Sequence, residues 1–410
     1  MLPYRPSPQE NTVKKPQIEV ARRIDRLPPY LFGEINAAKI AKRRAGVDVI
    51  DLGMGNPTDP TPEPIVEKLR EAVLDPRNHR YTVSIGVPNL RREVTKLYKR
   101  MWGVKLDPEK EVIACIGSKE GFSHLCLSLL GSGDTCVVPS PAFPIHVHSA
   151  AMTGANVIRI PLAPNSKLLE KLVDVAKHIT PKPKLAILNY PHNPTTRTVD
   201  LDFLREVVRI ARRHGIMLIH DFAYGLTTFG GYKAPSILQV RGGKDVAVEF
   251  FTMSKAWNMA GWRVGFAVGN RQMLRALAQV KGYYDYGIFQ AVQIAAIIGL
   301  RTCDDFVAEQ AKVYQERRDV LCRQLGRIGW RVRRPKASMF VWVPIPKAHR
   351  RMGSMAVALR LLEEANVAVA PGIGFGDEGE GYLRIALVEN AQRLTQAVRQ
   401  IGRAVRNWHV

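Results

Sequence analysis

Cysteine is scarce in this sequence, and its spacing gives no sign of a disulfide framework. The 410 residues include five cysteines, and no two of them form a Cys-x-x-Cys pair. An odd number also leaves one thiol without a partner inside the chain. We therefore expect small, buried apolar residues in a reducing compartment. They are Cys115, Cys126, Cys136, Cys303 and Cys322.

Long apolar runs are absent as well. No stretch approaches the roughly 18 residues that a membrane-spanning helix needs. The first twenty residues are polar, with prolines and mixed charge, and lack the apolar segment of a secretory signal. The sequence predicts a cytoplasmic protein without a membrane partner. Residues 1–22 are predicted to be an N-terminal arm, either flexible or lying on a partner subunit.

Acidic residues are few compared with basic ones. The chain has 37 Asp and Glu against 60 Lys and Arg, a formal net charge of +23. Such an excess can indicate nucleic-acid binding. Here the basic residues are spread along the whole chain, without a basic helix or an aromatic-basic ladder. We expect a solvated basic surface that attracts anionic substrates, and no nucleic-acid partner.

Strand and helix patterns alternate from about residue 110. Short apolar runs, each bounded by turn residues, predict strands separated by helices such as 201–214, which Gly215 ends. Alternation of this kind predicts an α/β fold with a mainly parallel sheet covered on both faces. The predicted strands are 111–116, 134–138, 184–188, 216–219, 246–251 and 263–268.

The last hundred residues have a different pattern. Antiparallel strands are predicted over 332–346, a helix over 355–365, a strand over 382–387 and a helix over 390–405. This α+β segment predicts a smaller domain, with which the N-terminal fifty-odd residues should pack. The expected limits are 23–60 with 295–410 for the small domain, and 61–294 for the large cofactor-binding domain.

Polar residues of interest fall at the ends of predicted strands, where open α/β sheets bind ligands. The string 252–265 places Lys255 just after a strand, with hydroxyls at Thr252 and Ser254 and a guanidinium at Arg263. A lysine in a partly desolvated, cationic site can bind a carbonyl cofactor covalently. The hydroxyls and the arginine can hold a phosphate. A lone Lys-Ala-Trp would be an ordinary surface turn, but the fourteen-residue string favours the cofactor site.

Two further strand ends carry candidate groups. Asp221 can keep the nitrogen of a pyridine cofactor protonated, so that the ring accepts electrons, and Tyr224 can bond to the ring's phenolic oxygen. In isolation, Asp-x-x-Tyr would equally suit a helix cap. The proline-bounded turn after the strand at 184–188 can direct Asn193 towards the same oxygen. His192 is expected to be structural rather than catalytic.

A fourth motif joins a strand to a helix through glycines. The segment 117–121, Gly-Ser-Lys-Glu-Gly, offers backbone N–H groups and a helix dipole for a phosphate. Ser118 and Lys119 are its candidate ligands. This motif alone is weak, because many helices begin in this way.

Taken together, these motifs resemble the fold-type I pyridoxal-phosphate (PLP) enzymes of aminotransferase class I/II, from about Ile24 to the C-terminus. The resemblance implies PLP on Lys255 and a seven-stranded, mainly parallel sheet. It also implies catalytic roles for Lys255, Asp221 and Tyr224. Thr252 stands where a serine is common, and its hydroxyl can serve equally well.

The same resemblance assigns roles at four more positions. Phe143 would stack on the cofactor ring, Gly55 would line the substrate pocket beside Asn193, and Arg384 would bind the substrate α-carboxylate in two parallel bonds. Tyr81 would reach the phosphate of the neighbouring subunit. A homodimer with shared active sites is therefore expected, and no metal.

Within this family, several strings are similar to bacterial glutamate–pyruvate (alanine) aminotransferases. They lie at 23–30, 233–237, 245–252, 335–339 and 371–376. They favour transfer between L-alanine and 2-oxoglutarate. Aspartate, LL-diaminopimelate or methionine as donor, and a PLP-dependent amino-acid lyase, stay open as alternatives. A PLP-dependent DNA-binding regulator would need a helix-turn-helix domain before about residue 24, where there is no room for one.

Overall fold

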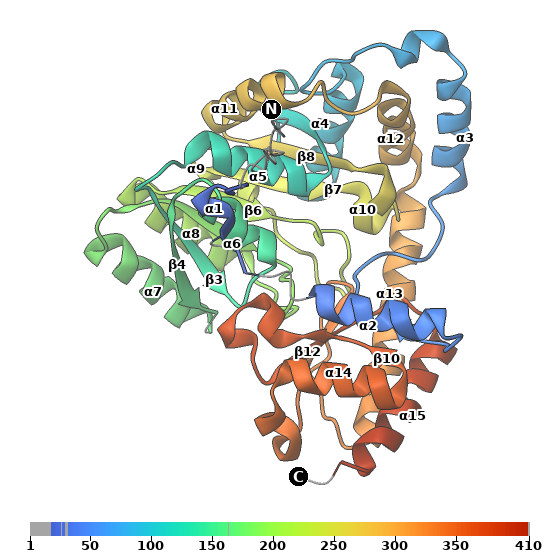
Figure 1. Cartoon of the computed structure of the whole chain (residues 1–410). Helices are drawn as coiled ribbons and strands as arrows, with labels where there is room; N and C mark the ends of the chain where they lie inside the picture. The colour runs from blue at the N-terminus through green and yellow to red at the C-terminus, as the bar shows by residue number, and fades with distance from the viewer. Residues whose placement is uncertain (1–17, 26, 29–31, 163, 409–410) are drawn as a thin grey trace, which may run out of the picture.

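The computed structural model describes residues 18–25, 27–28, 32–162 and 164–408. Most of the arm expected over residues 1–22 lies outside these ranges. Figure 1 shows an upper part built around a large sheet and a lower part that holds the C-terminal helices. We call them the sheet region and the C-terminal region.

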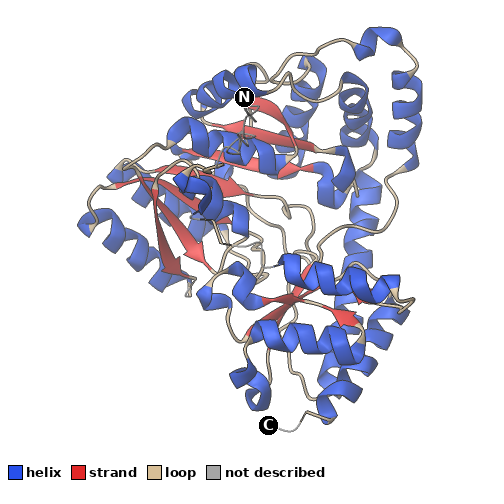
Figure 2. Ribbon diagram, in the orientation of Figure 1, coloured by secondary structure: helices blue, strands red, loops and turns tan. Residues whose placement is uncertain are grey.

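The sheet region is built on seven strands in the order β2-β8-β7-β6-β5-β3-β4 (Figure 2). Strand β8 alone runs against the others, since it pairs antiparallel with both β2 and β7. The predicted seven-stranded, mainly parallel sheet is confirmed. The strands are β2 (Val112–Ile116), β3 (Thr135–Ser140), β4 (Asn156–Pro161), β5 (Pro183–Asn189), β6 (Met217–Asp221), β7 (Ala247–Thr252) and β8 (Val264–Gly269).

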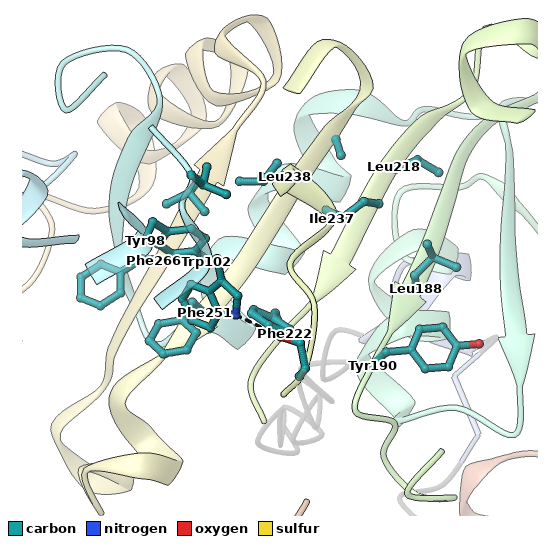
Figure 3. Close-up of a cluster of buried hydrophobic side chains, with 14 of the residues drawn as sticks. Tyr98, Trp102, Leu188, Tyr190, Leu218, Phe222, Ile237, Leu238, Phe251 and Phe266 are labelled. Atoms are coloured by element: carbon teal, nitrogen blue, oxygen red, sulfur yellow. Dashed lines mark hydrogen bonds between the residues drawn. The ribbon is translucent and has the colours of Figure 1, made fainter. Parts of the chain in front are cut away.

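These segments form strands because both of their faces are apolar. In β5, Ala186 and Leu188 enter one buried cluster, while Leu185 and Ile187 enter another. Alternate side chains point to opposite faces of a sheet, so a continuous apolar run fits a sheet covered on both sides. Figure 3 shows the first cluster, where Phe222 and Phe251 lie beside Trp102.

Helices cover both faces of the sheet (Figure 1). Helix α8 begins and ends where its sequence predicts: the Asp200 side chain accepts a hydrogen bond from Phe203 N, and Gly215 ends it at φ 69°. The helices of this region include α3 (Glu63–Val73), α4 (Pro88–Trp102), α5 (Ser118–Leu129), α6 (Pro144–Ala151), α7 (Asn165–His178), α8 (Leu201–His214), α9 (Gly243–Val246), α10 (Met253–Ala256), α11 (Arg271–Tyr284) and α12 (Gln290–Thr302).

The C-terminal region has its own apolar core and small sheets. Strands β11 (Ala370–Pro371), β12 (Tyr382–Ala386) and β9 (Phe340–Pro344) form an antiparallel sheet. Strand β1 (Ile50–Asp51) pairs with β10 (Val367–Ala368), which confirms that the N-terminal segment packs with the C-terminal one. Its helices are α2 (Phe32–Arg44), α14 (Ser354–Ala365) and α15 (Ala391–Arg406), and α1 (Arg22–Asp25) precedes them.

One long helix joins the two regions. In α13 (Asp304–Arg327), Val307 belongs to a core of the sheet region, whereas Tyr314 and Leu321 belong to that of the C-terminal region. Leu300 of α12 also packs in the sheet region. The domain limits expected from the sequence, at 60/61 and 294/295, stay a prediction.

Two sequence expectations were wrong in detail. Within 332–346 only Phe340–Pro344 forms a strand, because Pro335 has no N–H to donate and Ser338 adopts a left-handed φ of 78°. Ala337 makes only an isolated bridge, to Thr228. Strand β4 was not predicted, since it is a mostly exposed edge strand in which Ile160 alone is buried.

All five cysteines are free and buried, as the sequence predicts, and the reducing compartment stays a prediction. Within the described ranges, no helix is long and apolar enough to cross a membrane.

Candidate functional site

Three adjacent strands bring the predicted site residues to one edge of the sheet. Asn189 at the end of β5 pairs with Asp221 at the end of β6, which in turn pairs with Phe250 near the end of β7. Lys255 follows β7 in the short helix α10. Since these parallel strands end side by side, residues from three distant segments converge.

Lys255 lies half-buried in this convergence, among cationic neighbours. Its Nζ donates a hydrogen bond to the Gly55 carbonyl at 2.6 Å. Burial, then the charges of Arg384 and Arg263, lower the pKa of Lys255 from 10.5 to about 8, although Asp221 opposes the shift. The amine is therefore far more often neutral, and nucleophilic, at physiological pH than an ordinary lysine.

Asp221 is held by a histidine that sequence reasoning missed. The Nε2 atom of buried His146 lies 2.8 Å from Asp221 Oδ2. The other oxygen, Oδ1, accepts a hydrogen bond from Ala223 N at 3.2 Å, and Asn189 Nδ2 donates to the Asp221 carbonyl at 2.8 Å. These contacts fix the direction of the carboxylate. Neither of the two histidines in α6 gives a local sequence signal of this pairing, 75 residues away.

Two aromatic candidates flank the carboxylate. Phe143 precedes α6 and meets the His146 ring edge-on, with centroids 5.8 Å apart. Tyr224 is buried against Phe340, with centroids 5.7 Å apart, and burial raises its pKa well above 10. Its hydroxyl therefore stays protonated and can donate a hydrogen bond.

The start of α5 and the Arg263 side chain form a cradle that only glycine permits. A Cβ on Gly117, whose φ is 73°, would lie 2.2 Å from Arg263 Nη2, and one on Gly265 would lie 2.4 Å from Ser118 N. The guanidinium and the first N–H groups of α5 therefore lie close together. This is an arrangement suited to a phosphate.

Hydroxyl groups from the end of β7 and from α10 belong to the same end of the sheet. Thr252 Oγ1 accepts from Ser254 N at 3.2 Å and lies 2.9 Å from Ser254 Oγ. Thr252 Oγ1 also lies within hydrogen-bonding distance of the Val264 carbonyl, directly after Arg263. Both hydroxyls are thus fixed next to the strand that follows the arginine.

Arg384 completes the site from the C-terminal region. Its Nη1 donates to Asn193 Oδ1 and its Nη2 to the Gly53 carbonyl, each at 2.8 Å. The guanidinium lies over the rings of Phe340 and Phe375, 4.1 and 4.7 Å from their centroids. Two adjacent nitrogens of one plane are thus presented together, the geometry that matches a carboxylate.

Gly55 lies at the same place. A Cβ there would lie 2.4 Å from Phe340 Cζ, so no larger residue fits without moving the ring. His192, as expected, is structural: it is buried and its Nδ1 lies 2.8 Å from Thr195 Oγ1. Burial holds its pKa well below 6.5, so the ring stays neutral.

The side chains of two predicted cofactor ligands, Lys119 and Tyr81, lie outside this group of converging residues. Lys119 is exposed, whereas its neighbour Ser118 is partly buried. Tyr81 is 85% exposed and its ring packs against that of Tyr286, with centroids 4.7 Å apart. A role for Tyr81 therefore requires a second copy of the chain.

The residues that do converge fit a cofactor with three distinct groups. Lys255 supplies an amine for a carbonyl, and Asp221 supplies a carboxylate for a protonated ring nitrogen. Arg263, Ser118, Thr252 and Ser254 supply donors for a phosphate. PLP has these three groups on one pyridine ring. Their roles remain predictions from the geometry.

Comparisons with known proteins agree with this chemistry. Residues 47–401 match the family model of aminotransferase class I and II. The chain is 48% identical to the glutamate–pyruvate aminotransferase of Escherichia coli, over 92% of each chain. It is 41% identical to the LL-diaminopimelate aminotransferase of Moorella thermoacetica, over 95% of this chain and 99% of that one. Among solved structures, an aspartate aminotransferase mutant from Thermus thermophilus is similar, with 27% identity, a TM-score of 0.86 and coverage of 95% and 100%.

Proposed function

Because the chain belongs to the class I and II aminotransferases and is a PLP-dependent transaminase, we propose that it moves the amino group between L-alanine and 2-oxoglutarate. The observation that carries this choice is the 48% identity, over 92% of both chains, to a glutamate–pyruvate aminotransferase. The strings that resemble such enzymes in the sequence support it.

In the proposed reaction, Arg384 binds the substrate carboxylate. The carboxylate takes the place of Asn193 Oδ1 and the Gly53 carbonyl, which hold the two guanidinium nitrogens 2.8 Å away. The guanidinium lies over the rings of Phe340 and Phe375, which hold it in position. The substrate Cα is then directed towards the end of β7, where Lys255 lies.

Bound PLP supplies a ring that takes up the electron pair left when the Cα proton departs. Lys255 Nζ removes that proton, and its pKa of about 8 suits a base that works near neutral pH. Asp221, held by His146, would keep the ring nitrogen protonated. Tyr224 and Asn193 would hold the phenolic oxygen, and the cradle at Ser118 and Arg263 would hold the phosphate.

We further propose a homodimer that shares its active sites. Exposed aromatic side chains gather near Tyr81: Tyr283, Tyr284 and Tyr286 are 88%, 67% and 62% exposed, and Phe289 is 44% exposed. Exposed aromatic side chains that lie together can mark an interface. The second copy would cover them and receive Tyr81 at its phosphate cradle. The cytoplasmic location expected from the sequence stays a prediction.

The substrate is tested by absorbance spectra of the purified holoenzyme. We expect its yellow band to bleach on addition of L-alanine and to return on addition of 2-oxoglutarate, because each half-reaction changes the form of the cofactor. Lys255→Ala provides the control, in which neither change should occur.

Other outcomes would redirect the assignment. Bleaching by LL-diaminopimelate but not by alanine would favour LL-diaminopimelate as the amino donor. The 41% identity to an LL-diaminopimelate aminotransferase supports this second candidate function. Bleaching by aspartate or by methionine would identify that amino acid as the donor in the same way. Release of product without any oxo-acid acceptor would indicate a lyase. A yellow protein that no amino acid bleaches would contradict the proposal.

A further inference from the structure

A cavity outside the candidate site lies between the sheet region and the C-terminal region. Its volume is about 640 Å³, a size that suits a small ligand. From the sheet region it is lined by Pro141 and residues 195–198, and from the C-terminal region by residues 333–336, Trp342 and Tyr382. None of the predicted cofactor-binding or substrate-binding side chains lines it.

The walls of this cavity are strongly basic. Arg197 lies on one side, and Arg333, Arg334 and Lys336 on the other. Over the ranges that the structure describes, the latter three are exposed and form no ion pair. Glu378 is the one acidic lining residue, and its carboxylate already accepts a hydrogen bond from Ser140. Cations from both sides of a concave site raise the local concentration of anions.

The uncharged lining residues also suit an anion of moderate size. Thr196 and Thr198 add hydroxyl groups beside Arg197. Trp342 and Tyr382 form a stacked pair, with centroids 5.1 Å apart and an interplanar angle of 11°. This aromatic wall fixes the shape of the cavity, while guanidinium groups match phosphate and carboxylate oxygens in paired bonds.

We infer that this cavity binds a small, multiply charged anion, either phosphorylated or polycarboxylic. Arg333, Arg334 and Lys336 already exceed what one carboxylate needs, so a ligand with at least two negative charges is favoured. The site is separate from the phosphate cradle at Ser118 and Arg263, since no residue is shared between them.

The anion would act on the active site through two short covalent connections. Arg197 follows Asn193 by four residues along one loop. Tyr382 lies two residues before Arg384 on β12, and Trp342 is the direct partner of Arg384 on β9. Asn193 and Arg384 meet through a hydrogen bond between the two regions. An anion that bridges Arg197 to residues 333–336 therefore keeps the two regions close, so that Asn193 and Arg384 stay beside each other where the substrate carboxylate replaces their mutual hydrogen bond.

We expect the bound anion to activate the enzyme by lowering KM for the amino-acid substrate. The anion binds best when the two regions are close, so by linkage the amino-acid substrate also binds more tightly. We expect KM for the amino acid to fall roughly 5-fold at saturating anion. No lining residue reaches the reacting atoms, so kcat should change little.

Binding is measured by calorimetry on the holoenzyme, in which the cofactor occupies its own phosphate cradle. Pyrophosphate and citrate serve as separate probes, which distinguish phosphorylated from polycarboxylic ligands. One site per chain is expected for at least one probe, with affinity that falls as salt rises. The variant Arg333→Ala/Arg334→Ala/Lys336→Ala should bind that probe at least about 10-fold more weakly.

A matched variant removes the same charge elsewhere. Arg92, Lys99 and Lys110 are exposed and lie outside the cavity, so their replacement by alanine should leave the affinity within about 2-fold of wild type. Equal weakening in both triple variants, binding of neither probe, or competition between the probe and the amino acid would overturn the inference. Binding without a change in KM would overturn the activating role.

Discussion

The Arg384 guanidinium is held, in the absence of substrate, by an amide oxygen and a carbonyl that a substrate carboxylate must replace. An ammonium group cannot imitate this arrangement, because it lacks two parallel donors in one plane. The structure therefore ties substrate affinity to the shape of this side chain as well as to its charge.

We predict that Arg384→Lys lowers kcat/KM roughly 100-fold, about 2.7 kcal/mol of transition-state stabilisation. The yellow band of bound cofactor should remain, because Arg384 does not contact the phosphate cradle. Steady-state kinetics and absorbance spectra of the same preparation check both parts. A variant with unchanged KM for both substrates would show that another group binds the carboxylate.

Lys255 carries a prediction about pH. Burial, Arg384 and Arg263 lower its pKa to about 8, and a group with a lowered pKa becomes neutral at a lower pH. At pH 7 about one-tenth of such a lysine is neutral, against roughly 0.03% at a pKa of 10.5. The rate at which the apoenzyme binds PLP should therefore rise with pH, with a midpoint near 8.

Arg384→Gln provides the comparison for this pH profile. Without that cation the pKa of Lys255 should be higher, so the midpoint should move to higher pH. Stopped-flow absorbance between pH 6 and pH 10 measures both profiles. Identical midpoints would mean that Arg384 does not influence the lysine.

At the scale of elements, a buried ion cluster joins α5 to α11. Lys281 is fully buried on α11, and its Nζ lies 3.3 Å from Glu120 Oε1 on α5 and 3.1 Å from Asp285 Oδ1. Glu120 also accepts a hydrogen bond from Ile116 N, at the end of β2, and Asp285 accepts one from Gly287 N. The cluster thus fixes the turn before Ser118 and the loop that carries Tyr286.

Lys281→Met is expected to destabilise the holoenzyme by about 3–5 kcal/mol, because it leaves two partly buried carboxylates without their cation. Lys68→Met is the matched control, since its pair with Glu71 is more exposed and should contribute less than about 1 kcal/mol. Urea unfolding compares the two variants. Equal effects would show that the cluster contributes no more than a surface pair.

Among the strands of the large sheet, the sequence pattern predicted those that are apolar on both faces and missed β4, which is not. Strands such as β5 and β7 were predicted because a short, continuous apolar run between turns can adopt few structures other than a buried strand. Edge strand β4 was missed because its side chains are largely exposed. The segment before β9 was over-assigned, because Pro335 and Ser338 prevent the strand that was predicted to begin at residue 332.

The candidate site likewise contains residues that the sequence could predict and contacts that it could not. Residues at strand ends, such as Lys255 and Asp221, could be predicted because parallel strands bring their ends together. The contact between Asn193 and Arg384 spans 191 residues, and the pairing of His146 with Asp221 spans 75. Such contacts follow from packing of whole regions, which no local pattern contains.

For the whole molecule, the main prediction concerns shared active sites. If Tyr81 serves the partner's site, chains with Lys255→Ala and chains with Tyr81→Ala should complement one another. In a mixed dimer one site would contain wild-type Lys255 and wild-type Tyr81, while the other would lack both. A random mixture should recover about a quarter of wild-type activity.

Activity is measured at limiting PLP after the two chains are mixed, denatured and refolded together. Each variant treated alone provides the baseline. Light scattering gives the mass of the assembly in the same samples. A mixture no more active than the sum of its components would contradict shared sites, and a monomeric mass would contradict the dimer.

Because the five thiols are buried, a thiol reagent can label them only when the region around them unfolds. Burial raises the pKa of Cys136 to about 12 and that of Cys322 to about 11, so the folded protein offers almost no thiolate to a labelling reagent. Cys322 lies in the core of the C-terminal region, whereas Cys136 lies in strand β3 of the large sheet. The order in which the two sulfurs become labelled would therefore tell which region comes apart first, without any introduced probe.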